Sequence, residues 1–549
     1  MDSSVELLEE ETVVDENLLD LTVEDCVERI GQGPFQLKAM LVAGSTWIAD
    51  GLELVVQSML GGALACDWQV TVGEQTAVFV VVFVFMFVGS SFFGILADRL
   101  GRRRVCLIAI CVTFAFGLLS AFSVNIWMLY ATRGMCAFGI GGVHLAITTF
   151  AEFSPAKTRA RGILLLELFW AVGTILASVL ALFMMPQLGW RWLLGVAAFP
   201  VAVSFLLVLW LPESPRWLVQ RKRFDEASAI LLDVARQNRV TLPPFRLVST
   251  AGDRSLAAAA ANDKPRLQIL QLFHPVLRRV TLTMWLIWPI SVIAYYGIVL
   301  LTPAVFEAEA RGERCFSADA TATAVSDAAT TMMMTTVTGA ATMAPSLYAK
   351  CVKLTVGDFV SIMIESAFEV PGVLITVFLI DRLGRRRTAA IEYAVMGVCM
   401  LLMIPCWGRV FETGVLAVAR AMIIGAFQCA YVYTPEVYPA ELRATALGTA
   451  MSVSRVGAMA APFLAQYLAA ESLLATFLVF AALLFAASIA WYSLPFETTG
   501  QRLFESIAEL ELFVGGGGVM TELHDVGRRP DAEAVEDESE NEEHRPHWS

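Results

Sequence analysis

The chain has 549 residues, of which 57% are hydrophobic and only 17% are charged, and its formal net charge is −13. In soluble domains about a quarter of all residues are charged, so this composition excludes an ordinary soluble protein. Much of the negative charge lies in two acidic runs near the ends, at residues 9–11 and 536–543. These ends, residues 1–37 and 500–549, are predicted to be solvated, disordered tails.

Between the tails, the chain is dominated by long apolar runs. A run of about 20 apolar residues suffices to cross the hydrocarbon core as a helix. The runs predict twelve transmembrane helices, in two groups of six at residues 38–211 and 280–499. The predicted spans are residues 39–62, 77–97, 105–124, 126–150, 162–184, 190–211, 280–305, 356–380, 388–407, 412–434, 444–469 and 472–494.

A repeated motif indicates that the two groups of six are copies of one unit. The seven residues Asp-Arg-Leu-Gly-Arg-Arg-Arg fill positions 98–104 and again positions 381–387, each time after an apolar run. Glu-Phe-Ser-Pro at residues 152–155 and Glu-Val-Tyr-Pro at residues 436–439 recur at nearly the same offset. The fold class expected is therefore an all-α membrane protein of two pseudo-symmetric six-helix bundles, an arrangement that transporters use for alternating access.

Basic residues set the orientation of these spans. Lys and Arg are concentrated in the connections after even-numbered spans and are sparse in the others. Because basic loops stay on the cytoplasmic side, both termini and the connection at residues 212–279 are predicted to be cytoplasmic. Within that connection, Phe224, Ala227, Leu231 and Val234 recur at helical spacing and predict an amphipathic helix.

Cysteines do not suggest a disulfide framework. Most of the ten lie in predicted spans, where cysteine acts as a small apolar residue. Cys66, Cys315 and Cys351 fall at or near the outer side. A bridge between Cys315 and Cys351, across the long exterior loop, is one possible pairing, but sequence alone does not establish it.

Several motifs together resemble the major facilitator superfamily. Residues 94–103, Gly-Ile-Leu-Ala-Asp-Arg-Leu-Gly-Arg-Arg, look like the signature between its second and third spans, and Pro-Glu-Ser-Pro-Arg at residues 212–216 looks like a motif shared by sugar porters and organic ion transporters. Residues 31–36, 164–170 and 431–439 resemble the synaptic vesicle two-related transporter-like proteins in particular. The similarity covers roughly residues 24–505.

The repeated motif predicts a gating network at the cytoplasmic helix ends. Asp98 stands beside the Gly101 turn and several arginines, where charge-assisted pairs can tie neighbouring helices together. Such pairs hold one access state and break in the other; alternatively, the arginines only fix topology. The resemblance implies a network made of Gly94, Asp98, Gly101, Arg102, Glu152, Arg159, Glu213, Arg216, Asp381, Gly384, Arg385, Glu436, Arg443 and Glu497.

Ionisable residues inside the spans are the candidates for substrate binding or proton coupling, because each costs ~2.5–3.5 kcal/mol near the bilayer centre. Asp50 and Glu53 share a helix face and are expected to line a cavity between the halves; the alternative is a salt bridge with another span. Glu365 and Glu369 either line the cavity or pair with loop arginines. The candidate residues are Asp50, Glu53, Glu167, Tyr295, Tyr296, Glu365, Tyr431 and Arg455.

Arg455 and the tyrosines among these candidates carry further alternatives. Arg455, in a segment that resembles organic anion transporters, either meets an anionic substrate group or neutralises one of the cavity acids. The tyrosines suit an amphipathic ligand, or they simply pack. His144 is interpreted as a packing histidine.

These observations predict a secondary-active or facilitative carrier of a small organic solute, favoured to be an organic ion, that works by alternating access. The alternatives are a transport-inactive ligand-binding or regulatory protein on the same fold, and a sugar carrier. Sugar porters show Gln-Leu where this chain has Glu167-Leu168. No enzymatic activity, cofactor, metal or nucleic-acid partner is expected, since Walker and zinc-type spacings are absent from the sequence. A monomer in the plasma membrane or a vesicle membrane, coupled to a proton or another ion, is expected.

Overall fold

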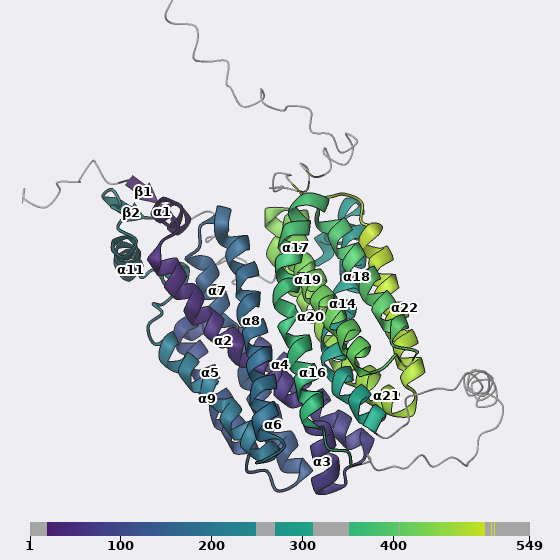
Figure 1. Ribbon diagram of the computed structural model, residues 1–549. Helices are drawn as coiled ribbons and strands as arrows, with labels where there is room; N and C mark the ends of the chain where they lie inside the picture. The colour runs from purple at the N-terminus through teal and green to yellow at the C-terminus, as the bar shows by residue number, and fades with distance from the viewer. Residues whose placement is uncertain are drawn as a thin grey trace, which may run out of the picture.

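The computed structural model in Figure 1 describes residues 19–248, 269–310, 351–405 and 407–499, with Ile507 and Leu510. Two helical bundles stand side by side, the first coloured purple to blue and the second teal to yellow. The first half contains β1 (Leu19–Leu21), α1 (Val23–Ile30), α2 (Pro34–Ser58), α3 (Leu60–Trp68), α4 (Val72–Leu100), α5 (Arg102–Ser120), α6 (Ile126–Val143), α7 (Leu145–Glu152), α8 (Ala156–Met184), α9 (Trp190–Val208), α10 (Pro215–Gln220), α11 (Phe224–Gln237) and β2 (Phe245–Leu247). The second contains α14 (Pro275–Ala310), α16 (Val356–Ala367), α17 (Glu369–Leu383), α18 (Arg385–Leu402), α19 (Arg409–Val437), α20 (Ala440–Pro462), the π-helix η1 (Phe463–Tyr467), α21 (Leu468–Glu471) and α22 (Leu473–Tyr492).

The helices correspond to the predicted spans. Within the described residues, ten helical stretches are long and apolar enough to cross a membrane, and α6 with α7, like α16 with α17, counts as one stretch. The other two predicted spans are occupied by α18 and by α20 with η1 and α21. The predicted fold class of two six-helix bundles is thus confirmed. Interior prolines such as Pro200 in α9 and Pro289 in α14 are tolerated because neighbouring helices and side chains satisfy the freed backbone groups.

Equivalent helices in the two halves begin in the same way. Thr71 caps α4 in a capping box with Glu74, and Thr355 caps α16 in a capping box with Asp358. Each box satisfies backbone N–H groups that a helix start would otherwise leave without partners. The next helix of each half starts at a glycine with positive φ, +100° at Gly101 and +87° at Gly384. The repeat therefore extends from sequence to local backbone geometry.

Particular helices pack together within each bundle and between the two bundles. Within the first bundle α2 packs on α8 and α4 on α6, and within the second α14 packs on α20 and α18 on α22. Between bundles, α8 packs on α16, α4 on α20 and α2 on α14. These between-bundle pairs surround the central region of the molecule, where a substrate site would be expected.

A small unit of two strands and short helices covers one end of the first bundle. β1 pairs in parallel with β2, with Leu19 opposite Phe245, and α11 packs on α1, as Figure 1 shows. The amphipathic stretch forms α11, which buries Ala227, Leu231 and Val234. Residues 19–37, expected as part of a tail, instead form β1, α1 and the start of α2, because the apolar side of α1 has α11 to pack against. Most of the acidic stretches at both ends lie outside the described residues.

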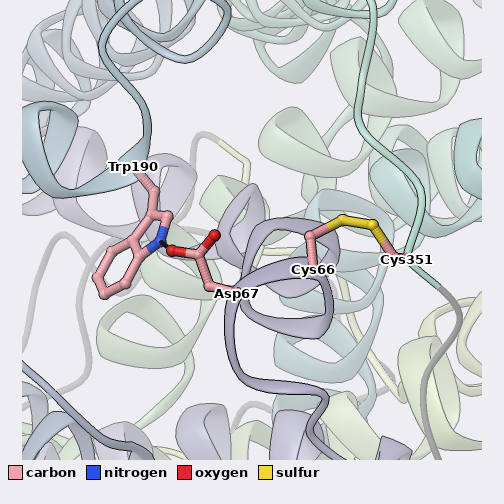
Figure 2. The surroundings of a disulfide bond; sticks show 4 residues. All are labelled: Cys66, Asp67, Trp190 and Cys351. Carbon is pink, nitrogen blue, oxygen red and sulfur yellow. Dashed lines mark hydrogen bonds between the residues drawn. A yellow bond between two sulfur atoms is a disulfide. The ribbon is translucent and has the colours of Figure 1, made fainter.

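One disulfide joins the two halves. Cys66, in α3, is bonded to Cys351, just before α16, as Figure 2 shows. Pairing of Cys351 with Cys315 is therefore wrong for this structure. The physical reason is that bundle packing brings α3 next to the start of the eighth span, a proximity that no sequence spacing reveals. Cys315 itself lies outside the described residues.

Candidate functional site

A cavity lies between the two bundles, lined by both halves of the chain. The space between its lining residues is about 650 Å³, which includes space open to solvent. The first half contributes residues of α2, α4 and α8, and the second contributes residues of α14, α19 and α20. The predicted candidates that line it are Asp50, Glu167, Tyr295, Tyr296, Tyr431 and Arg455.

The charged groups of this cavity are not paired with one another. The Asp50 side chain is almost fully buried, and its Oδ2 lies 3.9 Å from His144 Nε2. Arg455 Nη1 lies 3.7 Å from the sulfur of Met86. Among the residues that the structure describes, no carboxylate comes within ion-pair distance of Arg455. Hence Arg455 forms no ion pair with Asp50 or Glu167 in this conformation.

Aromatic rings form much of the cavity wall. The rings of Trp47 and Trp170 are tilted by 60° to each other with centroids 5.3 Å apart, and Phe427 and Tyr431 lie edge to face at 5.2 Å. The Trp170 indole N–H donates to the Tyr295 hydroxyl, which joins α8 of the first half to α14 of the second. Aromatic faces beside carboxylates attract organic cations through their ring quadrupoles, so this lining suits a solute with a positive centre.

His144, interpreted from the sequence as a packing histidine, lines the cavity. Its ring lies edge to face against Trp47 at 5.0 Å, and its Nδ1 is buried without a hydrogen-bond partner among the described residues. A buried polar atom without a partner at a cavity wall is a natural contact for a ligand or water. Its position in the cavity gave no signal in the sequence beyond a single histidine in a span.

Glu53 does not line this main cavity. Its Oε2 accepts from Arg133 Nη1 at 2.7 Å, while Arg133 Nε donates to Gln57 Oε1 at 2.7 Å. Both side chains of the ion pair are almost fully buried. A smaller void beside the pair is also lined by Asp50. The sequence left two placements open for Glu53, in the cavity lining or in a salt bridge with another span. The structure shows the salt bridge.

Glu365 also lies away from the main cavity lining. It is fully buried and accepts a hydrogen bond from Thr302 Oγ1 at 2.9 Å. Its neighbour one helical turn on, Glu369, accepts from Arg420 Nε at 2.8 Å. The partner of Glu369 is thus a span arginine and not a loop arginine. Arg420 is the second-half counterpart of Arg133, but the acids differ: Glu53 lies in α2, the first span of its half, and Glu369 lies in α17, in the second span of its half.

The Glu369 carboxylate also links the halves. Thr174 Oγ1 of α8 donates to it at 2.9 Å, and the Tyr295 hydroxyl donates at 3.1 Å. The sequence held one signal for this network, the echo of Arg133-Gly-Met in Arg420-Ala-Met. Its buried position and its partners depend on the packing of α8, α14, α17 and α19.

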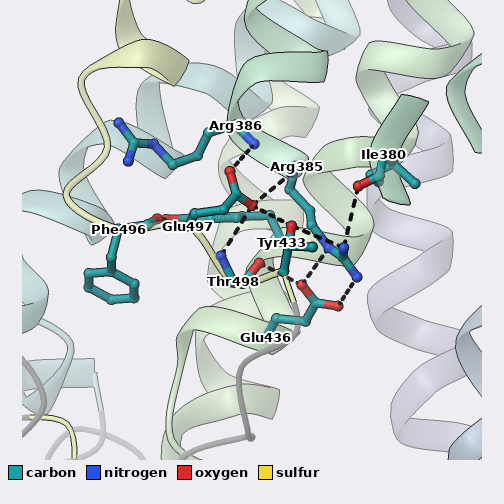
Figure 3. A network of polar contacts seen from close by, with 9 residues as sticks. Ile380, Arg385, Arg386, Tyr433, Glu436, Phe496, Glu497 and Thr498 are labelled. Carbon is teal, nitrogen blue, oxygen red and sulfur yellow. Dashed lines mark hydrogen bonds and ion pairs between the residues drawn. The ribbon is translucent and has the colours of Figure 1, made fainter. Parts of the chain in front are cut away.

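The predicted gating network of the second half is built around two glutamates, as Figure 3 shows. Glu436 accepts from Arg385 at both Nε and Nη2, and from the Thr498 hydroxyl. Glu497 accepts from the backbone N–H groups of Arg385 and Arg386 at the start of α18. A carboxylate at a helix N-terminus is stabilised by the unpaired N–H groups and the helix dipole. The network thus joins α18, α19 and the segment after α22.

The first half repeats the pattern. Arg102 pairs with Glu152, and Glu213 accepts from the backbone N–H groups of Arg102 and Arg103. Glu24 of α1 adds a contact that the second half lacks among the described residues, since it lies 3.3 Å from both Arg159 and Arg216.

Other residues expected in the network stand apart from it. Asp98 and Asp381 are exposed, and neither carboxylate has an ion-pair partner within the described part of the chain. The Asp98 contacts shown are through its carbonyl, which accepts from Trp217 and Arg221. Gly94 faces open space, and the buried Nε of Arg443 has no hydrogen-bond partner among described residues. In this conformation the glutamates, not the aspartates, hold the arginines.

Comparison with known proteins agrees with this architecture. A family model described as sugar (and other) transporter matches residues 55–308 and 309–510. The synaptic vesicle 2-related protein of Xenopus laevis is 39% identical over 485 residues, covering 88% of this chain and 82% of that protein. The organic cation/carnitine transporter 7 of Arabidopsis thaliana is 31% identical over 518 residues, covering 89% and 96%. The xylose transporter XylE from E. coli, in a partially occluded inward open conformation, matches with a TM-score of 0.61 at 14% identity, covering 85% of this chain and all of that one.

Proposed function

Because the chain belongs to the sugar (and other) transporter family of the major facilitator superfamily, we propose that it carries a small organic ion with a cationic centre by alternating access. The protein is a multi-pass membrane transporter, and the proposal concerns its solute and mechanism. We further propose that both termini are cytoplasmic, that the chain acts as a monomer, and that it resides in a vesicle membrane, as the names of its relatives suggest.

The composition of the central cavity carries this proposal. Two carboxylates, Asp50 and Glu167, stand with aromatic rings around a space that both halves line. A cationic centre would lie against the rings and near the carboxylates, where desolvation strengthens both attractions. Arg455 offers a fork of donors to an anionic group at the other end of a zwitterion. Carnitine, named in one relative, has this pairing of a quaternary ammonium and a carboxylate.

The duplicated networks allow each half to move as one rigid unit during the conformational change. In each half, a cytoplasmic arginine and two glutamates fix helix ends to one another. Contacts that cross between the halves occur elsewhere, at Thr174 with Glu369 and at Ser178 with Ser366. The halves can therefore move as rigid units, and each access state is favoured by the contacts made in it.

Coupling to a proton is proposed for Glu53 and its partner Arg133. The pair is buried beside a void that Asp50 also lines. Protonation of Glu53 would remove the attraction that holds Arg133, so it would change the energy of the first bundle next to the solute site. Glu365 is proposed to serve structure, through its hydrogen bond with Thr302.

Uptake into proteoliposomes tests the proposal. Labelled organic cations, zwitterions and anions would be supplied with and without a pH gradient. We expect saturable uptake of a cation or zwitterion, abolished by Asp50→Asn or Glu167→Gln and retained by the exposed control Glu226→Gln. Arg455→Gln should weaken zwitterions more than simple cations.

Two results would overturn the proposal. Uptake of anions alone would contradict the assigned charge of the solute. Tight binding without uptake of any solute would show a ligand-binding protein on a transporter fold.

A further inference from the structure

We propose that the disulfide between Cys66 and Cys351 is a redox-controlled clasp that keeps the outer side of the carrier closed while it is oxidised. The bond joins α3, which directly follows α2 of the first half, to the segment that leads into α16 of the second. A covalent link between the two moving units bears directly on alternating access, so this inference rests on the proposed mechanism.

The bridge connects equivalent points of the two halves. Cys66 shortly precedes the Thr71 cap of α4, and Cys351 shortly precedes the Thr355 cap of α16. Because α4 and α16 with α17 are the second span of each half, the bonded cysteines are related by the pseudo-symmetry of the fold. A bond between such points lies close to the axis that relates the bundles. It therefore acts between the halves and not as a brace inside one of them.

The surroundings show that the halves are closed together at this end. Figure 1 shows α3 at the end of the molecule opposite β1, β2, α1 and α11. A Cβ added to Gly62 of α3 would stand 2.6 Å from the carbonyl oxygen of Val352, so the halves touch through backbone here. Ser178 and Ser366 also meet across the halves, at 3.2 Å. Opening toward the outside must separate these contacts.

The clasp limits how far the two halves can separate at this end. The Cα atoms of the bonded cysteines are 4.5 Å apart, and disulfides span at most ~6.8 Å between Cα atoms, so this point can widen by only about 2 Å. That is less than the ~2.8 Å diameter of a water-sized probe. The segment from Cys351 to α16 adds little freedom, since Leu354 packs on the apolar core and Thr355 is tied to Asp358.

The bond is placed where a reductant can reach it. Cys351 is exposed, and an outer hollow of about 1060 Å³ is lined by Cys66 together with Asp67 and Trp190, two residues seen beside the bond in Figure 2. A dithiol reductant would attack one sulfur as its thiolate, break the S–S bond and form a mixed disulfide. Its second thiol then displaces the remaining protein sulfur. The chain gains two thiols and two electrons, and the reductant becomes a disulfide.

Accessibility of the central cavity from the outer side tests the clasp without knowledge of the solute. Ser454 lines the cavity, and Ser454→Cys provides a thiol there. The full chain with this substitution would be placed in vesicles with the α3 end facing the bath. A membrane-impermeant methanethiosulfonate reagent is added, and mass spectrometry follows modification at position 454. The variants compared carry Cys66→Ala with Cys351→Ala, or, as a matched control, Cys106→Ala with Cys399→Ala, which are buried free cysteines inside separate halves.

We expect modification about tenfold faster or more in the Cys66→Ala, Cys351→Ala variant than in the oxidised parent, because removal of the clasp raises the population open to the outside. The oxidised parent, treated with dithiothreitol that is then removed, should match the variant. The Cys106→Ala, Cys399→Ala control should match the untreated parent.

Three outcomes would overturn the clasp. Equal rates in the parent and the clasp-free variant would show that the bond does not restrict opening, while leaving the carrier proposal intact. Peptide mapping that finds Cys351 bonded to Cys315 would remove its structural basis. No modification in any variant would contradict alternating access itself, and with it the clasp.

Discussion

Replacement of Arg420 by methionine should destabilise the protein more than any exposed charge change. Its guanidinium is 1% exposed, and its Nε lies 2.8 Å from Glu369 Oε1, while Glu369 is 0% exposed. Arg420→Met leaves a buried carboxylate with only the hydroxyls of Thr174 and Tyr295 as donors. Removing one partner of a buried pair costs about 3–5 kcal/mol, because the other charge stays buried without compensation.

The second substitution should restore much of that loss. Arg420 Nη2 is buried without a hydrogen-bond partner among the described residues, so the native pair is itself incompletely satisfied. Replacing both members with apolar side chains removes the desolvation cost of both charges and is often neutral. We therefore expect Arg420→Met with Glu369→Met to unfold closer to the wild type than either single variant. The coupling free energy should be about 3 kcal/mol or more.

Equilibrium unfolding in mixed detergent micelles would measure this double-mutant cycle. The matched control is the exposed pair of Arg223 and Glu226, with side chains 41% and 55% exposed, for which a coupling of about 0.3–0.5 kcal/mol is expected. Additive effects at Arg420 and Glu369, or an Arg420→Met variant as stable as the wild type, would refute the assignment of a stabilising buried pair.

Three further predictions concern a glycine turn, a buried thiol and the pair between Glu53 and Arg133. Gly384→Ala should lower the free energy of unfolding, measured by thermal unfolding, by about 1–3 kcal/mol, since φ is +87° and ψ is 167° there and the added Cβ would stand 2.7 Å from Glu497. The control Gly94→Ala, in open space within a helix, should be neutral or stabilising. Equal losses of stability in the two variants would contradict this reasoning. Burial raises the pKa of the Cys26 thiol to about 11, so the thiol is protonated below that pH, and alkylation followed by mass spectrometry should be slow at pH 8 and faster in denaturant. Glu53→Gln should remove the effect of a pH gradient on uptake while solute binding persists; an unchanged response to the gradient would exclude Glu53 from coupling.

Local patterns in the sequence predicted the architecture because the bilayer constrains each segment separately. An apolar run must form a helix that satisfies its own backbone, whatever its neighbours do. Lys and Arg in the loops predict the orientation by an equally local rule. The exact repeat at residues 98–104 and 381–387 added the division into two halves. The same motif predicted which helix ends carry the arginine networks, although Asp98 and Asp381 are not the acids that hold the arginines here.

Partners across the bundles were decided only by the tertiary structure. Glu53 and Asp50 lie one helical turn apart, yet one is tied to Arg133 and the other lines the cavity. Sequence distance gives no information on which faces of separate spans meet. The echo of Arg133 in Arg420 therefore did not indicate Glu369 as its partner, and the lining role of His144 had no signal. The same holds for Cys66, which meets Cys351 only because two copies of one unit close against each other at the end that carries α3. Hydrophobicity fixes that a helix forms, while the packing of twelve helices fixes what each polar side chain touches.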